Sequence, residues 1–462
     1  MSTGYVQLHI PEEFLRERET GAFDTRLWFL AFAAHVPLAL LLQADPTIGA
    51  VHGLLLLAFG LYAALAGRVD RVAYTAAYLA GAEVLWRMTS SALFWEFGKY
   101  AVVILFIAAI IRNHTWRASP LALTYFAVLL PSCVMTLQVL DFDEARKQIS
   151  FNLSGPLSLA ISVWFFTNCR FTRQQISHLL LAFMIPLASV VTITGIATFL
   201  AGPIVFGTNS NFATSGGFGP NQVASSLGLG VLFGLLALTI TPRISFAGRM
   251  LLTLVTVAFG VQSAMTFSRS GLILTLLAGM AGLLFLLRDP KARVRLVTLC
   301  VSGYLAVTYL ILPALDSFTG GALVHRFEST NLSHRDDLVF ADLAIWLEDP
   351  IGGSGPGVAK SVRASMTHSS SIAHTEFSRL LSDHGLFGIV AMGILFLIGA
   401  RMLLAAEPGG HRAFVAVMVS WALIYMAVNG MRLVAPSLLL GLGALHWQAA
   451  SFDRQFYVKE EI

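Results

Sequence analysis

Charged residues are scarce in this sequence. Of its 462 residues, 12% are Asp, Glu, Lys or Arg and 56% are hydrophobic, and the mean hydropathy is +0.73. Ordinary soluble domains have about 25% charged residues, so the composition excludes a soluble domain. The formal net charge is +4. Because the basic residues are spread along the chain without forming a stripe, nucleic-acid binding is not indicated.

Cysteine and the common catalytic motifs are also scarce or absent. The three cysteines, Cys133, Cys169 and Cys300, form neither a CxxC pair nor a disulfide framework. The sequence has no GxSxG elbow and no P-loop, which argues against serine-hydrolase and nucleotide-driven chemistry. Its histidine spacings match no common zinc pattern. We therefore expect no cofactor and no metal site.

Long apolar runs are what the chain does contain. A helix of about 20 apolar residues crosses a bilayer, and such runs recur from Leu27 almost to the end. We predict an all-α polytopic membrane protein with about fourteen transmembrane helices. Twelve is the alternative, because the spans near residues 72–88, 93–111, 412–429 and 432–450 are short or interrupted. The predicted divisions are an N-terminal tail (1–26), a first bundle of about eleven helices (27–315), a long loop (316–384), a second bundle of about three helices (385–450) and a C-terminal tail (451–462).

The distribution of Lys and Arg predicts the orientation, because short cytoplasmic loops hold an excess of both. With the N-terminus inside, the inner segments contain 19 of the 30 basic residues and the short outer loops contain six. The remaining five lie in residues 316–384, a loop long enough to escape the rule. We expect both termini to be cytoplasmic and the long loop to lie outside, which in a bacterium means the periplasm or the cell exterior.

Several charges depart from this distribution. A charge near hydrocarbon is unfavourable unless it is paired or faces a wet cavity, so each is a functional candidate. Arg269 and Arg432 lie in short outer loops, and Arg269 has no partner close in sequence. In or beside two predicted spans, Glu83 can pair with Arg87 and Glu96 with Lys99, at i,i+4 and i,i+3 spacing. These four residues therefore either form local ion pairs or contribute to a polar site.

The long outer loop gathers groups suited to acid–base and phosphate chemistry. Five of the twelve histidines lie in it. SHRDDLVFADLAIWLEDP predicts a short amphipathic helix that Pro350 stops, and IGGSGPG follows, in which Gly355 and Gly357 allow a sharp turn or a close approach to a ligand. The next stretch, SIAHTEFSRLLSDHGLFG (371–388), predicts a helix with a plausible end at Gly385. On that helix we expect Arg379 to pair with Glu376 or Asp383, and His384 to be structural.

Arginine and histidine together indicate a reaction type. The planar arginine fork donates paired hydrogen bonds to phosphate and stays charged. A histidine with a near-neutral pKa can accept a proton from a hydroxyl. The combination suggests group transfer from a phosphate leaving group to a hydroxyl at the outer membrane face.

Three segments, in order, resemble the O-antigen ligase and polymerase superfamily. They are TFSRSG (266–271), HRDDLVFADLAIWLEDPIGGSGPG (334–357) and AHTEFSRLLSDHGLFG (373–388). GGFGPNQVAS (216–225), which contains Asn221, resembles the segment of the family that precedes a span, although Asn221 could equally cap the following helix. WEFGKY (95–100) resembles exopolysaccharide-polymerase members. The similarity covers roughly residues 210–400.

This resemblance implies a glycosyltransferase of the GT-C class that uses an undecaprenyl-diphosphate-linked glycan as donor, without nucleotide sugar or metal. It implies that Arg269 and Arg335 bind the diphosphate and that His374 is the general base on the acceptor hydroxyl, with inversion at the anomeric carbon. Thr375 stands where many members have Asn. Further substrate-binding candidates are Arg432, Asn221, Lys99, Glu96, Arg87, Gly355 and Gly357.

Four functions fit the sequence. The leading hypothesis is a Wzy-type polymerase that joins lipid-linked repeat units, with a glycan as acceptor, the lipid bilayer as surroundings and a chain-length regulator as a further candidate partner. The alternatives are a ligase that transfers the glycan to lipid A core, a protein O-oligosaccharyltransferase, and a transporter or flippase. Against a transporter, the charges cluster on the outer side and no internal repeat is visible.

Overall fold

The computed structural model describes residues 25–200, 202, 204–207, 209–287, 290–328, 335–367 and 375–448. The described chain is almost entirely helical, as predicted, and its strands β1 (Arg170–Phe171) and β2 (His446–Trp447) are two residues each. The predicted tails lie outside the described residues, except for Thr25 and Arg26. His374 also lies outside them, and the side chain of Arg335 is not described.

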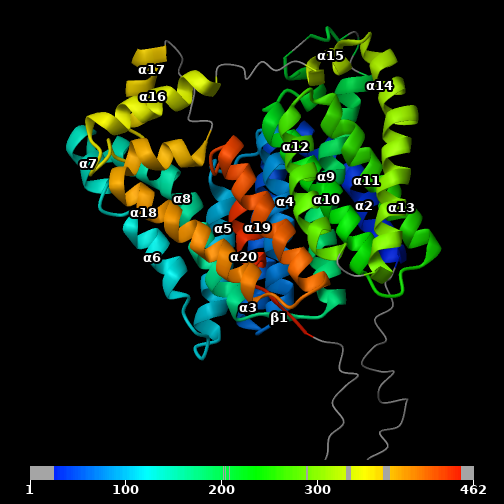
Figure 1. Cartoon of the computed structure of the whole chain (residues 1–462), viewed down its shortest axis with the longest axis horizontal. Coiled ribbons are helices and arrows are strands. Elements are labelled where there is room, and N and C mark those ends of the chain that lie inside the picture. Colours follow the sequence, from blue (N-terminus) through cyan, green and yellow to red (C-terminus); the bar gives the residue numbers. More distant parts are fainter. Residues whose placement is uncertain are drawn as a thin grey trace, which may run out of the picture.

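The first half of the described chain forms a bundle (Figure 1). Its helices are α2 (Thr25–Ala44), α3 (Pro46–Leu65), α4 (Val69–Met88), α5 (Phe97–Arg112), α6 (Pro120–Val128), α7 (Cys133–Val139), α8 (Phe142–Thr167) and α9 (Arg173–Phe199). Helix α8 begins twelve residues before the predicted span of 154–168. Its early start follows from Asp141, whose carboxylate caps the helix by accepting a hydrogen bond from the Glu144 N–H.

The second half contributes the remaining helices. They are η1 (Ala213–Ser215), α10 (Pro220–Ile240), α11 (Phe246–Met265), α12 (Arg269–Leu286), α13 (Pro290–Ala306), η2 (Val307–Ile311), α14 (Leu312–Thr319), α15 (Ala322–Glu328), α16 (Arg335–Glu348), α17 (Ala359–Thr367), α18 (Glu376–Ala405), α19 (Gly410–Val428) and α20 (Ala435–Leu442). The predicted amphipathic helix of the long loop is confirmed as α16, which packs with α17 against α18. Figure 1 shows this group at one side of the molecule.

Eleven spans in the described residues are long and apolar enough to cross a membrane, so the chain is a multi-pass membrane protein. Helix α4 is long enough but carries more charge, and α5 has 16 residues. Among these eleven spans, α8, α9, α10 and α19 are the most buried. The span Cys300–Thr319 is mostly exposed, and only Leu315 and Thr319 in it are buried.

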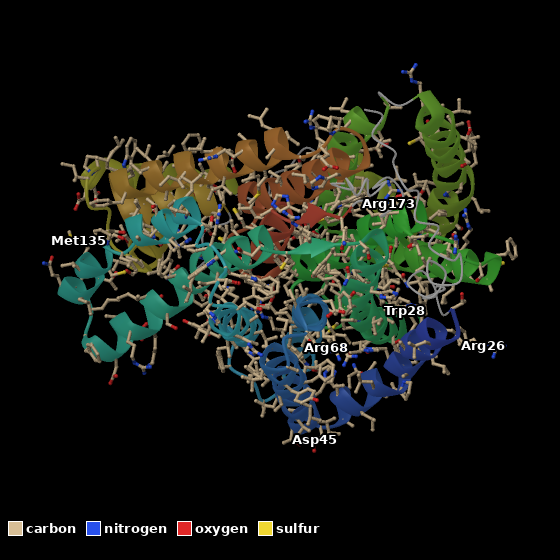
Figure 2. All side chains as sticks on the ribbon, turned by 90° about the horizontal axis from the view of Figure 1, so that it is seen from below. Arg26, Trp28, Asp45, Arg68, Met135 and Arg173 are labelled. Carbon is tan, nitrogen blue, oxygen red and sulfur yellow. The ribbon has the colours of Figure 1, made fainter. Side chains whose placement is uncertain are left out.

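The hydrogen bonds between the segments that connect the helices show that these segments lie at two opposite ends of the bundle. At one end, called here the strand end, residue 170 pairs with residue 446, Arg112 donates to the Leu65 carbonyl, and His411 contacts the Leu445 carbonyl. Figure 2 labels Arg26 of α2, Arg68, which directly precedes α4, and Arg173 of α9. The opposite end, called the site end, contains the segments 89–96, 216–221, 266–268, 349–358 and 429–434. The chain alternates between the two ends, as an antiparallel bundle requires.

The last predicted span, residues 432–450, has a different structure. Helix α20 contains eight residues, about 12 Å at 1.5 Å per residue, which is well short of the roughly 30 Å of a bilayer core. The non-helical segment 429–434 precedes it, and β2 follows it. Non-helical backbone is tolerated deep in a membrane protein where it is buried against protein. The segment 429–434 meets this condition, because most of its residues are buried.

Candidate functional site

Two buried carboxylates hold the segment 429–434 in place. Glu376, the first residue of α18, accepts a hydrogen bond from the Met431 N–H at 2.9 Å. Glu83 of α4 accepts one from the Val434 N–H at 2.7 Å. Both glutamates are at most 2% exposed. Because these bonds flank Arg432, the backbone position of Arg432 is fixed from both sides.

Arg87 lies on the same helix as Glu83 and connects three elements. Its Nη2 donates to Glu83 at 2.6 Å and to the Trp95 carbonyl at 3.0 Å, and its Nη1 donates to Gln222 of α10 at 2.8 Å. The guanidinium also lies 4.4 Å from the centre of the Trp95 ring. The predicted Glu83–Arg87 ion pair is confirmed, and it forms part of a larger polar assembly.

Arg432 brings further positive charge to this assembly. Burial lowers the pKa of Arg432, and the positive charges of Arg87 and Arg363 lower it further, while Tyr425 and Glu376 act in the opposite direction. The charges of Arg87 on α4 and Arg363 on α17 therefore both act on Arg432. Glu83, which accepts from Arg87 and from the Val434 N–H, places Arg87 beside the segment 429–434. We call Arg87, Arg363 and Arg432 the arginine cluster. A bound anion would relieve the repulsion within such a cluster.

Arg363 and Arg379 are held by carboxylates within the α16–α18 group. Arg363 Nε lies 3.0 Å from Asp342 of α16, and Ser378 donates to the other Asp342 oxygen at 2.6 Å. Burial raises the pKa of Asp342, although the nearby Arg363 charge opposes the rise. Arg379 pairs with Glu376 and also with Asp383 at 3.1 Å. The prediction for Arg379 is confirmed, with both partners engaged.

Arg269 begins α12 directly after a strained turn. Phe267 has a φ of 57°, a left-handed conformation that is rare for a bulky residue. Its carbonyl accepts a hydrogen bond from Arg326 Nε at 3.2 Å, and Thr266 Oγ1 accepts from the Ser268 N–H at 3.1 Å. Burial and then the positive charge of Arg269 lower the pKa of Arg326, so these two guanidiniums also lie near each other. Strained backbone conformations that neighbouring contacts hold in place occur mainly at functional sites.

The first turn of α10 lies between the strained turn and the arginine cluster. Asn221 accepts a hydrogen bond from the Ser268 hydroxyl at 2.7 Å, one residue before Arg269. The next residue, Gln222, accepts from Arg87. Asn221 has no side-chain cap bond to its own helix, whose N-cap position is Gly219. Two consecutive side chains of α10 thus contact Arg87 and Ser268, the residue before Arg269.

Lys99 and Glu96 differ from the predicted local pair. Lys99 is 2% exposed and donates to Ser154 of α8 at 3.2 Å, with its ammonium 5.8 Å from the centre of the Phe151 ring. Among the ion pairs of the described residues, Glu96 and Lys99 do not form one with each other. Glu96 is the N-cap residue of α5. The helix therefore directs Lys99 into the bundle interior and leaves Glu96 at its end.

The glycine-rich turn packs tightly against its neighbours. Gly355 has a φ of 95° and donates its N–H to the Asp383 carbonyl at 3.0 Å, and a Cβ there would lie 2.6 Å from the Thr136 backbone nitrogen. Gly357 has a φ of 85°, and a Cβ there would lie 2.5 Å from Gln148. Both glycines are required for the turn itself.

Helix α18 bends where the sequence predicts a helix end. Gly385 has φ 56° and ψ −131°, which are not helical values, and the chain continues as a span beyond it. The preceding residue, His384, is fully buried and its imidazole Nδ1 contacts the Ser132 hydroxyl, so its predicted structural role is confirmed. Thr375 caps α18 by accepting a hydrogen bond from the Ser378 N–H at 2.9 Å. This cap fixes the start of the helix directly after His374.

A chain of hydrogen bonds crosses four helices beneath the arginine cluster. His35 contacts the Ser189 hydroxyl at 2.8 Å and the Tyr78 hydroxyl at 2.9 Å, and Tyr78 contacts His52 at 3.0 Å. Trp86 donates to His52 Nδ1 at 3.1 Å. Ser189 donates its proton to the His35 carbonyl and therefore accepts from His35 Nδ1. Tyr78 then donates to His35 and His52 donates to Tyr78, so all the bonds of the chain run in one direction. The chain braces α2, α3, α4 and α9, and Trp86 precedes Arg87.

Replacing His35 by alanine should destabilise the protein. The change takes a hydrogen-bond partner from the half-buried Tyr78 hydroxyl and from the buried Ser189 hydroxyl, and leaving a buried polar group without a partner costs about 1–3 kcal/mol. Chemical denaturation in mixed micelles measures the effect. His114→Ala, at an exposed position, is the control and should not alter the stability. Equal stability of His35→Ala and the wild type would show that the chain of bonds does not brace the bundle.

The sequence did not indicate two of the contacts that build the site. Glu376 was expected to pair along its own helix, but its bond to Met431 joins residues 55 apart. The ion pair between Arg363 and Asp342 joins two helices. Within the described residues, no group of three or more His, Cys, Asp or Glu side chains is arranged to hold a metal ion.

No protein-family model and no curated protein matches the chain.

Proposed function

We propose that this protein is a membrane glycosyltransferase that transfers a glycan from a polyprenyl diphosphate to an acceptor hydroxyl. The observation that supports this most is the arginine cluster at the site end, where the charges of Arg87 and Arg363 both act on Arg432. Several guanidinium charges in one region suit a diphosphate, since arginine stays charged and its planar group is suited to phosphate oxygens. The resemblance of the TFSRSG, α16 and α18 segments to the O-antigen ligase and polymerase superfamily supports the same assignment.

In the proposed reaction the acceptor hydroxyl attacks the anomeric carbon of the donor sugar. A new C–O bond forms as the bond to the diphosphate oxygen breaks, and the hydroxyl proton moves to His374. Arg269, Arg335 and the arginine cluster stabilise the negative charge that develops on the leaving diphosphate. One displacement without a covalent enzyme intermediate inverts the anomeric configuration.

Among acceptors, we propose a second lipid-linked repeat unit, which makes the protein a polymerase. The WEFGKY resemblance supports this choice, and Trp95 of that segment lies on Arg87. A ligase acting on lipid A core is the alternative. Deletion of the gene separates them: single repeats without long polymer would support the polymerase, whereas free lipid-linked polymer would support the ligase.

Replacing His374 by alanine should lower turnover about 10²–10⁴-fold, the usual contribution of a general base. The assay uses purified protein, a lipid-diphosphate glycan and an acceptor glycan, and follows product over time. His325→Ala is the matched control, since His325 is exposed on α15 of the same loop, and it should keep its turnover. Product formation by His374→Ala at the wild-type rate would refute the general-base assignment. Failure of the wild type to form any product, together with transbilayer movement of the lipid-linked glycan, would favour a transporter.

A further inference from the structure

A cavity of about 530 Å³ lies at the site end, among the segment 89–96, α8, α17 and α18. Its lining is mixed: aromatic rings, side-chain amides and charges of both signs face it. Such a surface suits a sugar, which presents apolar C–H faces and hydroxyl edges, better than it suits a lipid chain. The cavity is large enough for more than one sugar ring, given that ligand pockets commonly measure about 300–1,000 Å³.

Two amides of α8 are held in fixed positions on the cavity wall. Asn152 accepts a hydrogen bond from Arg379 at 3.2 Å and donates to the Gln148 carbonyl at 2.8 Å. Gln148 donates to Glu144 at 2.7 Å. The aromatic rings of Phe94 and Phe151 complete this wall. A wall of fixed polar groups beside rings can orient a sugar without rearranging.

Positive charge predominates around the cavity. Five cationic residues line it, Arg146, Lys147, Lys360, Arg363 and Arg379, compared with three carboxylates, Glu96, Glu144 and Asp383. The carboxylates Asp342 and Glu376, outside the lining, pair with the two inner arginines. Arg146, Lys147 and Lys360 are exposed. Two carboxylates of the lining, Glu96 and Glu144, are partly exposed, and Lys147 lies 3.9 Å from Glu144. Arg146 and Lys360 are therefore the side chains best placed to attract an anionic ligand.

The cavity adjoins the arginine cluster through shared residues. Arg363 lines the cavity and also belongs to the cluster. Arg379 lines it as well, and its partner Glu376 holds Met431, next to Arg432. A ligand in the cavity would thus lie beside the region assigned to the diphosphate.

We propose that this cavity binds an acidic saccharide segment, one whose sugars carry carboxylates, with Arg146, Lys147 and Lys360 contacting the carboxylates and Gln148 and Asn152 contacting hydroxyls. The inference rests on the proposed function, in which a glycan is both donor and acceptor. It specifies the class of glycan and the residues that select it. The segment can belong to the donor or to the acceptor, since both carry the same repeat unit in a polymerase.

A binding measurement tests the proposal without any transfer reaction. Full-length protein in lipid nanodiscs is titrated against fluorescein-labelled tetragalacturonate, and anisotropy is followed, with labelled maltotetraose as the neutral probe and empty nanodiscs as the blank. We expect the acidic probe to bind at least tenfold more tightly than the neutral one, and its affinity to fall as salt rises. Equal binding of the two probes, or no binding of the acidic probe, would overturn the proposal.

Reversing the charge of two cavity residues tests whether the saccharide binds in this cavity. The double variant Arg146→Glu and Lys360→Glu changes two exposed residues and should weaken tetragalacturonate binding about tenfold or more. Arg401→Glu, exposed at the strand end, is the control and should bind normally. Unchanged binding by the double variant would place the saccharide elsewhere and overturn the proposal. Transfer activity of the wild type is measured separately, so a negative binding result does not contradict the proposed glycosyltransferase activity.

Farnesyl diphosphate, which has a diphosphate and no sugar, distinguishes the two sources of the segment. Tetragalacturonate that binds equally well in its presence occupies a site separate from the diphosphate and supports an acceptor segment in the cavity. If tetragalacturonate and farnesyl diphosphate displace each other from the wild type but not from the double variant, the segment in the cavity belongs to the donor.

Discussion

Replacing Arg432 by lysine is expected to lower glycan transfer by about 10²–10³-fold, the range observed when one preorganised charge-stabilising donor is removed from an active site. Lysine keeps the positive charge but loses the planar fork that binds two phosphate oxygens at once. The segment 429–434 should keep its conformation, because Glu83 and Glu376 bind its backbone and not its side chains. The turnover number, measured with saturating donor, reports the loss.

A matched control for this prediction lies at the strand end. Arg412 donates two hydrogen bonds to the Ala406 carbonyl, so Arg412→Lys also removes a fork from a partly buried arginine. It should leave transfer unchanged. Arg269→Lys and Arg335→Lys should behave like Arg432→Lys if these residues bind the same diphosphate. Full turnover in Arg432→Lys would remove Arg432 from the diphosphate site.

Replacing Glu376 by alanine should destabilise the protein by about 3–5 kcal/mol, the usual result of removing one partner from a buried ion pair. Arg379 would keep Asp383 but lose its other carboxylate, and the Met431 N–H would lose its acceptor. Chemical denaturation in mixed micelles measures the free energy of unfolding. Glu376→Gln keeps an acceptor oxygen and should lose less stability.

Glu348→Ala provides the comparison for Glu376→Ala, because Glu348 is exposed at the end of α16. We expect its stability to match the wild type. A Glu376→Ala protein as stable as Glu348→Ala would mean that the contact with Met431 does not hold the segment 429–434.

The sequence predicted those parts of the structure that depend on neighbours along the chain. Apolar run length located most of the helices, and i,i+3 or i,i+4 spacing anticipated the pairs of Arg87 and Arg379. The bend of α18 followed from Gly385, where the backbone adopts a positive φ. Each of these features is determined within a few residues.

The remaining features depend on contacts between distant segments. The sequence left open whether Lys99 pairs with Glu96 or contributes to a polar site, and the packing of α5 against α8 brings Ser154 to it. The short α20 looked like a full span because its composition is apolar. The bonds from Met431 to Glu376 and from Val434 to Glu83 explain how the backbone before α20 is satisfied. Whether Arg269, Arg335 and His374 face one cavity stays a prediction.

The bond between Glu83 and Val434 also affects how the protein is assembled. The two residues are 351 positions apart, so at a synthesis rate of about 5–20 residues per second roughly 20–70 s pass before Val434 follows Glu83 from the ribosome. During that interval α4 lies in the membrane with a charged pair whose final backbone partner does not yet exist. Completion of the site therefore coincides with insertion of the last helices, and a chain truncated before residue 434 should be a substrate for membrane quality control.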